Sequence, residues 1–275
     1  MDHLETRAKR RESKAGPLGT RDTVILLAAT AGTVVVNWLA NLLRFGGETT
    51  GSVSSAHSTL VTPAGYAFSI WSLIYVGLFA FAAQALRDPG LDQLQRRRIF
   101  WSYLGSSVLN ATWIVVWHLG LVTLSAGVIA ALLASVLVIY KALDRHRAVA
   151  SLRQRATILV PISLYAAWLS VATVINITIA VRANGLTGMI LPSETWATLL
   201  LVMVAGLTLV VALPRRDVAW LGVATWALAA VGVARLGEPS GSLTIVAFSF
   251  AGLLGLVGAT MVVARRRPAN TTTPA

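Results

Sequence analysis

Eight apolar runs of about 20 residues, separated by short segments that hold nearly all of the charge, constrain this chain more than any other feature. An α-helix of that length spans the hydrocarbon core of a bilayer. Only 12% of the residues are charged, whereas a soluble domain usually has about a quarter. Because so apolar a chain cannot cover itself with polar groups in water, we predict an all-α integral membrane protein of about eight transmembrane helices.

The limits of the apolar runs give the predicted helices. They cover residues 23–43, 63–86, 100–119, 121–140, 158–181, 195–213, 218–234 and 243–264. The third and fourth runs almost touch, and we place their junction at Trp117-His118-Leu119-Gly120, an aromatic pair followed by a turn-forming glycine. One long helix there would leave seven spans, with the two termini on opposite sides of the membrane.

The positions of lysine and arginine decide between the two counts. With eight spans, 20 of the 23 basic residues fall on one side, and only Arg44, Arg182 and Arg235 fall on the other. Cytoplasmic loops collect positive charge, so eight spans with both termini in the cytoplasm are expected. The formal net charge of +12 therefore reflects topology rather than nucleic-acid binding. The Ala-, Val- and Arg-rich composition favours a bacterial inner (plasma) membrane.

Charged and metal-binding groups are missing from the middle of the spans. All eleven acids lie in loops, tails or span ends, and no lysine or arginine lies mid-span, which argues against ion-coupled transport. The four histidines are far apart in sequence, so we predict no metal site. His118 could ligate a haem, but a lone histidine at a span end is more often an interfacial residue. We expect no resident cofactor and no enzymatic activity.

Aromatic and amide side chains instead form stripes on three predicted helices. Steps of three and four residues place each stripe on one helix face. The stripes are Phe68, Trp71, Tyr75 and Phe79 in the second helix, Asn110, Trp113 and Trp117 in the third, and Tyr165, Trp168, Ala172 and Asn176 in the fifth. They could fill the core of the bundle, or they could line a cavity for a large, flat, apolar ligand. Periodicity alone favours packing.

Three motifs in these helices resemble the TspO/MBR family, which contains the translocator protein and the tryptophan-rich sensory proteins. Residues 63–75 (PAGYAFSIWSLIY) resemble the family's second-helix signature, P-G-W-V-F-G-P-V-W-T-x-L-Y. Residues 109–113 (LNATW) are similar to its third-helix L-N-x-x-W. Residues 165–176 follow its fifth-helix Y-x-x-W-x-S-x-A-T-x-x-N, which is the most specific of the three matches.

The resemblance covers approximately residues 20–183 and implies five tilted helices around a pocket. Known family ligands are tetrapyrroles such as protoporphyrin IX, sterols and synthetic aromatic compounds. The ligand-binding residues it implies are Phe68, Trp71, Tyr75, Asn110, Trp113, Tyr165, Trp168, Ala172 and Asn176. Residues 45–62, rich in Gly, Ser and Thr, would be either a solvated connector or a cover over the pocket mouth. The resemblance favours a ligand cavity over packing as the interpretation of the aromatic stripes.

These observations divide the chain into four parts. We predict a basic cytoplasmic tail (1–21), a TspO-like five-helix domain (22–183), three additional transmembrane helices (184–264) and a disordered tail (265–275). The additional helices have no counterpart in small family members, and they could cover a surface that those members use for dimerisation. The sequence therefore leaves open whether this protein forms a homodimer. The tryptophans of the additional helices, Trp196, Trp220 and Trp226, are expected mostly at the membrane interface.

The leading functional hypothesis is a membrane sensor or binding protein for a planar lipophilic ligand, with a porphyrin as the expected tetrapyrrole. Its expected partners are membrane lipids and this small ligand, not nucleic acid. One alternative is a transporter or permease for a lipophilic solute. A third hypothesis, ranked last because no general base or metal ligand set is visible, is a porphyrin-degrading enzyme.

Overall fold

The computed structural model describes residues 19–44, 47, 49–186, 191–238 and 241–266, and these residues form helices without a strand. The long helices are α2 (Thr20–Leu42), α4 (Ile70–Gln84), α5 (Gln93–His118), α6 (Val122–Ala142), α8 (Val160–Ala183), α9 (Ser193–Arg215), α10 (Val218–Ala234) and α11 (Ser242–Arg266). The shorter elements are α3 (Thr50–Ala56), η2 (Gly65–Ser69), η3 (Ala85–Arg87), η4 (His146–Ala148), α7 (Leu152–Gln154) and the π-helical turn η5 (Arg155–Leu159). Most of each predicted tail lies outside the described residues.

Among the described residues, seven helical stretches are long and apolar enough to cross a membrane. The eighth apolar helix, α10, has 17 residues and is about 25 Å long at 1.5 Å per residue. Its bounds coincide with the predicted ones, and most other predicted ends lie within a few residues of those observed. The predicted all-α membrane architecture is thereby confirmed.

The junction between the third and fourth spans also follows the prediction. α5 ends at His118, α6 begins at Val122, and Gly120 between them has a φ of +72°, which suits glycine. At its other end α5 begins well before residue 100, because Asp92 and Gln95 form a capping box with hydrogen bonds of 2.7 and 2.9 Å. The apolar run marks only the part of this helix that is suited to the hydrocarbon core.

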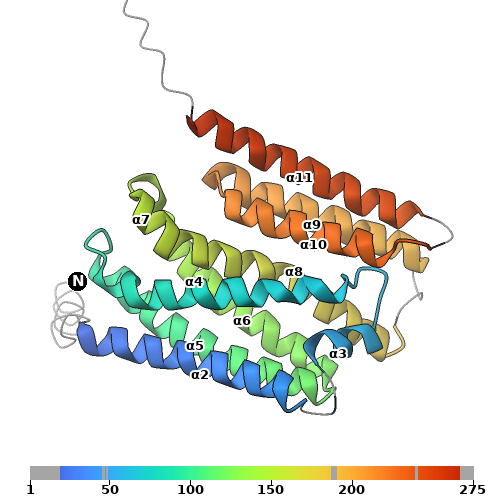
Figure 1. Cartoon of the computed structure of the whole chain (residues 1–275), viewed down its shortest axis with the longest axis horizontal. Helices are drawn as coiled ribbons and strands as arrows, with labels where there is room; N and C mark the ends of the chain where they lie inside the picture. The colour runs from blue at the N-terminus through green and yellow to red at the C-terminus, as the bar shows by residue number, and fades with distance from the viewer. Residues whose placement is uncertain (1–18, 45–46, 48, 187–190, 239–240, 267–275) are drawn as a thin grey trace, which may run out of the picture.

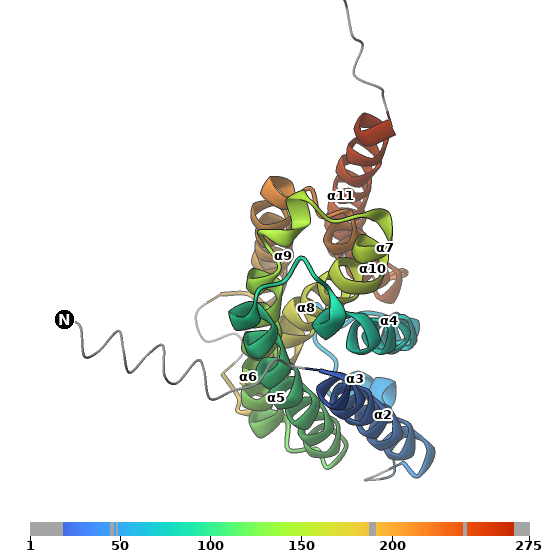
Figure 2. The same cartoon turned by 90° about the vertical axis from the view of Figure 1, so that its left-hand side faces the viewer.

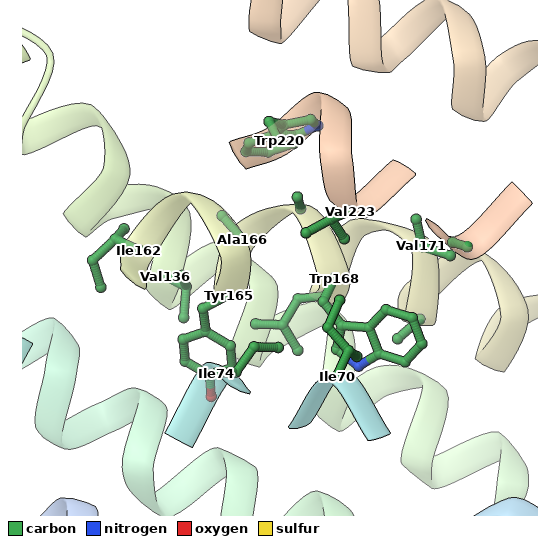
Figure 3. Packing of buried hydrophobic residues seen from close by; sticks show 14 of the residues in the cluster. Ile70, Ile74, Val136, Ile162, Tyr165, Ala166, Trp168, Val171, Trp220 and Val223 are labelled. Carbon is green, nitrogen blue, oxygen red and sulfur yellow. The ribbon is translucent and has the colours of Figure 1, made fainter. Parts of the chain in front are cut away.

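Helix α8 is the central element of the bundle. In the apolar part of the Leu152–Ala183 stretch, which contains α8, 78% of the residues are buried, compared with 22–44% in the other six candidate spans. It packs against α4 and α6 on one side and α10 on the other, and the end-on view of Figure 2 places it between these groups. Figure 3 shows Tyr165 and Trp168 of α8 near Ile70 and Ile74 of α4, with Trp220 of α10 on the opposite side.

The three basic connecting segments, residues 87–98, 141–155 and 215–216, meet at one end of the bundle, near α7 in Figure 1. Arg215, at the end of α9, makes a bidentate ion pair with Asp144 at 2.8 and 2.9 Å. Asp217, buried before α10, accepts hydrogen bonds from Arg147 at 3.0 Å and from the Tyr140 hydroxyl at 2.8 Å. These contacts join the 141–155 segment to the α9–α10 connection, as eight spans require. The side of the membrane on which this end lies stays a prediction.

The three C-terminal helices dock on the rest of the bundle through α10. The backbone N–H of Ala64 donates to Ala230 O at 2.9 Å, and the Trp226 indole N–H donates to Ala67 O at 3.2 Å. Trp220 is buried, with its ring 5.1 Å from that of Tyr140. Trp220 is therefore buried in a helix contact rather than exposed at an interface as expected, whereas Trp196 and Trp226 are both exposed, so that their interfacial role stays a prediction.

Two glycines of α10 provide a test of the α10–α11 contact. A Cβ added at Gly232 would lie 3.0 Å from three ring atoms of Phe248, whereas one at Gly222 would meet nothing within 4 Å. We expect Gly232→Ala to destabilise the protein by about 1–3 kcal/mol through overpacking. Gly222→Ala, the control, should be neutral or slightly stabilising, because alanine favours a helix. Thermal unfolding in detergent measures both, and equal stability of the two variants would contradict a close approach of Phe248 to Gly232.

Candidate functional site

A groove of about 910 Å³ lies between α2 and α4, with α5 behind it and the α3 segment at one end. This volume is within the range of sites for small organic molecules, roughly 300–1,000 Å³. We call it the α2–α4 groove. It is lined by Val34, Asn37, Trp38, Asn41, Thr49, Thr50, Gly51, Ser52, Ser55, Gly65, Phe68, Trp71, Ser72, Tyr75, Val76, Phe79 and Ile114.

The wall formed by η2 and α4 is aromatic. All four members of the predicted second-helix stripe, Phe68, Trp71, Tyr75 and Phe79, line the groove, so their shared face is confirmed. The rings of Trp71 and Tyr75 stack with centroids 5.5 Å apart and planes 23° apart. At the rim, Phe79 is 38% exposed, and Trp38 on the opposite wall is 61% exposed. Because both helices are membrane spans, this exposed rim faces the region that lipid would occupy.

Helix α3 closes one end of the groove through Thr50. The Thr50 hydroxyl donates to Asn41 Oδ1 and also lies 3.0 Å from His118 Nε2. The Thr50 backbone N–H donates to Asn41 Oδ1 at 3.0 Å, and Thr50 O accepts from the Trp117 indole at 3.2 Å. Of the two roles considered for residues 45–62, the described part is thus a folded cover. His118 is buried beneath it rather than exposed at an interface.

The aromatic stripes of the second, third and fifth predicted helices meet behind this wall. The Trp71 ring centroid lies 5.8 Å from Trp113, 6.0 Å from Tyr165 and 6.4 Å from Trp168. Phe68 contacts Trp168 edge-on at 6.0 Å. The void among these rings has a volume of only about 10 Å³, enough for about one water molecule. The hollow expected between these helices is therefore filled, and the larger space lies on the α2 side.

The predicted amide groups join helices across the bundle. Asn110 accepts from Asn37 Nδ2 at 2.8 Å and donates to the Tyr165 hydroxyl at 2.9 Å, which links α2, α5 and α8. Asn176 accepts from the Trp113 indole and from Ser125 Oγ, both at 3.2 Å. In a bilayer such bonds contribute about 1 kcal/mol each to helix association.

The nine predicted site residues thus separate into two groups. Phe68, Trp71 and Tyr75 line the α2–α4 groove. The other six lie in the packed layer beside or behind them: Asn110, Trp113, Tyr165, Trp168, Ala172 and Asn176. At the small void, the Trp168 indole N–H and the Ser54 hydroxyl are buried and have no hydrogen-bond partner within the described part of the chain. These two groups could bond a single water molecule.

Sequence reasoning missed the α2 wall of the groove, and of the α3 end it offered only a possible cover within residues 45–62, without naming the residues that contact the groove. Asn37 and Asn41, one turn apart in an apolar span, were the available signal, because polar groups in a span usually face the bundle interior or a cavity. Trp38 and the Thr49–Ser52 segment carried no such signal. Their place depends on how the chain turns back after α2 to pack α3 against α5.

Comparison with known proteins agrees with the motifs. The chain matches the family model described as TSPO-like protein over residues 23–262, a range that includes α9, α10 and most of α11. Comparisons with curated proteins and with solved structures give no match. Because the matched range covers most of the 275 residues, the chain belongs to the TSPO-like protein family.

Proposed function

We propose that this protein is a membrane sensor or binding protein that takes a planar lipophilic ligand, a tetrapyrrole such as protoporphyrin IX, into the α2–α4 groove. The observation that carries the proposal is the groove itself, with four aromatic side chains from one face of η2 and α4 along one wall. Its opposite wall carries the amides of Asn37 and Asn41. A flat ring system with a few polar substituents fits such a site.

The binding energy would come mainly from apolar burial, at about 25 cal/mol per Å² removed from water or from a polar interface. Each ring stacked on Trp71 or Tyr75 would add roughly 0.5–1.5 kcal/mol. The amides of Asn37 and Asn41 and the Ser72 hydroxyl would orient the ligand's polar groups. Since the exposed rim lies within the spans, the ligand would enter sideways from the bilayer.

In this proposal, Phe68, Trp71 and Tyr75 touch the ligand, and the packed residues act through them. Trp113 and Trp168 hold the Trp71 ring in place by direct contact. Asn110 and Tyr165 fix α2 relative to α5 and α8, which sets the width of the groove. Substitutions in the packed layer are therefore expected to change stability together with affinity.

A bulky residue in the wall should block the groove without disturbing the packed cluster. Ser72 is exposed and lines the groove, so Ser72→Phe should weaken protoporphyrin IX binding at least tenfold. Leu73→Phe, at the next position, which is exposed but outside the groove lining, is the matched control. Tryptophan quenching during titration of the purified protein measures both. Unchanged saturable binding by Ser72→Phe would remove the groove as the site.

The contact between α3 and Asn41 should control ligand release. Thr50→Val keeps the side-chain shape but removes the hydroxyl bonds to Asn41 and His118. Losing them costs about 1 kcal/mol each, about 2 kcal/mol together, so the dissociation rate should rise by up to about thirtyfold while association changes little. Thr112→Val is the matched control, because Thr112 is exposed outside the groove lining and its hydroxyl donates within α5, to Val108 O. Stopped-flow fluorescence measures the rates, and equal rates in all three proteins would contradict a cover formed by α3.

A permease would carry the porphyrin across the bilayer, whereas a binding protein would not. Protein reconstituted into sealed vesicles should retain porphyrin with one-site saturation and should not increase its transfer across the bilayer above that of empty vesicles. Transfer that increases with protein content, and that Ser72→Phe abolishes, would favour the transport alternative. Illuminating the same complex tests the enzymatic hypothesis. We expect the pigment absorption spectrum to stay unchanged, whereas a porphyrin-degrading enzyme would change it.

A further inference from the structure

A second cavity, rich in arginine, lies at the opposite end of the bundle from α3. It has a volume of about 700 Å³ and is lined by Asp144, Arg147, Ala148, Leu152, Arg155, Pro214, Arg215 and Arg216. We call it the basic cavity. It lies between the connection from α6 to α8 and the end of α9, and it shares no lining residue with the α2–α4 groove.

Positive charge in the basic cavity exceeds the nearby negative charge. Asp144 pairs with Arg215, and the buried Asp217 next to the cavity pairs with Arg147 at 3.0 Å. Within the part of the chain that the structure describes, three guanidinium groups of the lining, those of Arg147, Arg215 and Arg155, stand against these two carboxylates; the fourth lining arginine, Arg216, makes a further interaction. Among the described residues, Arg155 has no ion pair with an acid; its guanidinium donates instead to Ala150 O at 3.1 Å and Arg147 O at 2.8 Å. The cavity therefore carries a net positive charge that suits an anion.

The arginines are held in place before any ligand arrives. The Arg147 guanidinium lies 4.3 Å from the centre of the Tyr140 ring, and that of Arg215 lies 5.6 Å from it. The hydrogen bonds to two backbone carbonyl oxygens hold the Arg155 guanidinium in place as well. A planar guanidinium forms paired hydrogen bonds with phosphate oxygens, and a pre-ordered side chain loses less entropy on binding. Phosphate is the anion that this arrangement suits.

Backbone geometry at Arg216 is a further feature of the cavity. This residue ends α9 in the left-handed conformation, with φ of +48°, where glycine is usual. A non-glycine side chain is strained in that conformation. Replacing Arg216 by glycine should therefore remove a charge from the cavity while making the helix end easier to form. A loss of anion binding in this variant could then not be explained by a loss of stability.

Exposed apolar side chains around the cavity indicate the source of the phosphate. Leu152, in its lining, is 87% exposed, and Val149, in the same connection, is 77% exposed. Side chains of this kind at the end of a membrane span fit the boundary between headgroups and acyl chains better than water. Basic pockets between transmembrane helices on the cytoplasmic side commonly bind anionic headgroups.

We propose that the basic cavity binds the phosphate of an anionic phospholipid, with its acyl chains over Leu152 and Val149. The attraction comes from Arg155, whose guanidinium has no acidic partner among the described residues, next to the ion-paired Arg147 and Arg215. The site is independent of the ligand groove, so it stands whether or not the protein binds a porphyrin. It gives the α6–α8 connection and the α9–α10 connection a shared lipid ligand.

Native mass spectrometry of the delipidated full chain in neutral detergent tests the proposal. Phosphatidylglycerol should bind as one adduct at least ten times more tightly than phosphatidylcholine with the same acyl chains. Inorganic phosphate should compete only at much higher concentration. Equal binding of the two lipids would overturn the proposal, and phosphate binding as tightly as phosphatidylglycerol would mean a free-phosphate site instead.

Charge-matched variants locate the site. Arg155→Gln and Arg216→Gly, singly and together, should weaken phosphatidylglycerol binding, by at least tenfold in the double variant. Arg153→Gln removes the same charge two residues away, from a side chain that is exposed and outside the cavity, and should bind like the parent. Thermal unfolding shows whether each variant is folded, and Arg216→Gly should be at least as stable as the parent. An equal loss in Arg153→Gln would show a non-specific charge effect and overturn the site.

Discussion

A chain of hydrogen bonds crosses the bundle from Asn37 on α2, through Asn110 on α5, to Tyr165 on α8. Within a bilayer the hydrophobic effect does not draw helices together, so close packing and such bonds decide how they associate. Because Asn110 bonds on both sides, it fixes the distance of α2 from the central helix. That distance leaves α2 separated from α4 along the groove, where no equivalent bond joins them among the described residues.

The aromatic residues therefore have two roles: those between α4, α5 and α8 pack the bundle, and those facing α2 line the groove. Trp113 and Trp168 fill the space between α4, α5 and α8, leaving a void of about 10 Å³. Trp71 lies at the boundary, since it contacts both of these rings and also lines the groove. Packing and ligand binding, which the helical stripes presented as alternatives, are thus adjacent layers of one cluster, and the proposed ligand would rest on a rigid aromatic wall.

The three C-terminal helices extend this bundle through α10 rather than forming a separate body. Hydrogen bonds to Ala67 of η2 and from Ala64 just before it join α10 to the turn that precedes α4, and the Asp217 contacts join the beginning of α10 to α6 and α8. One consequence is that the basic connections meet at one end and enclose the basic cavity. Each end of the protein thereby acquires a different chemistry: a Thr50-anchored cover over an aromatic groove, and an arginine-lined pocket.

The sequence by itself determined the number, class and approximate limits of the helices, because span length and charge position are local properties that a bilayer imposes directly. It also determined the family, through motifs within single helices, and the shared face of Phe68, Trp71, Tyr75 and Phe79. Only the tertiary structure decided which stripes meet a hollow and which are filled. That outcome depends on the distances between helices, which arise from side chains far apart in sequence, such as Asn37 with Asn110 and Thr50 with His118. The residue pattern of a single helix gives no information about its distance from another helix.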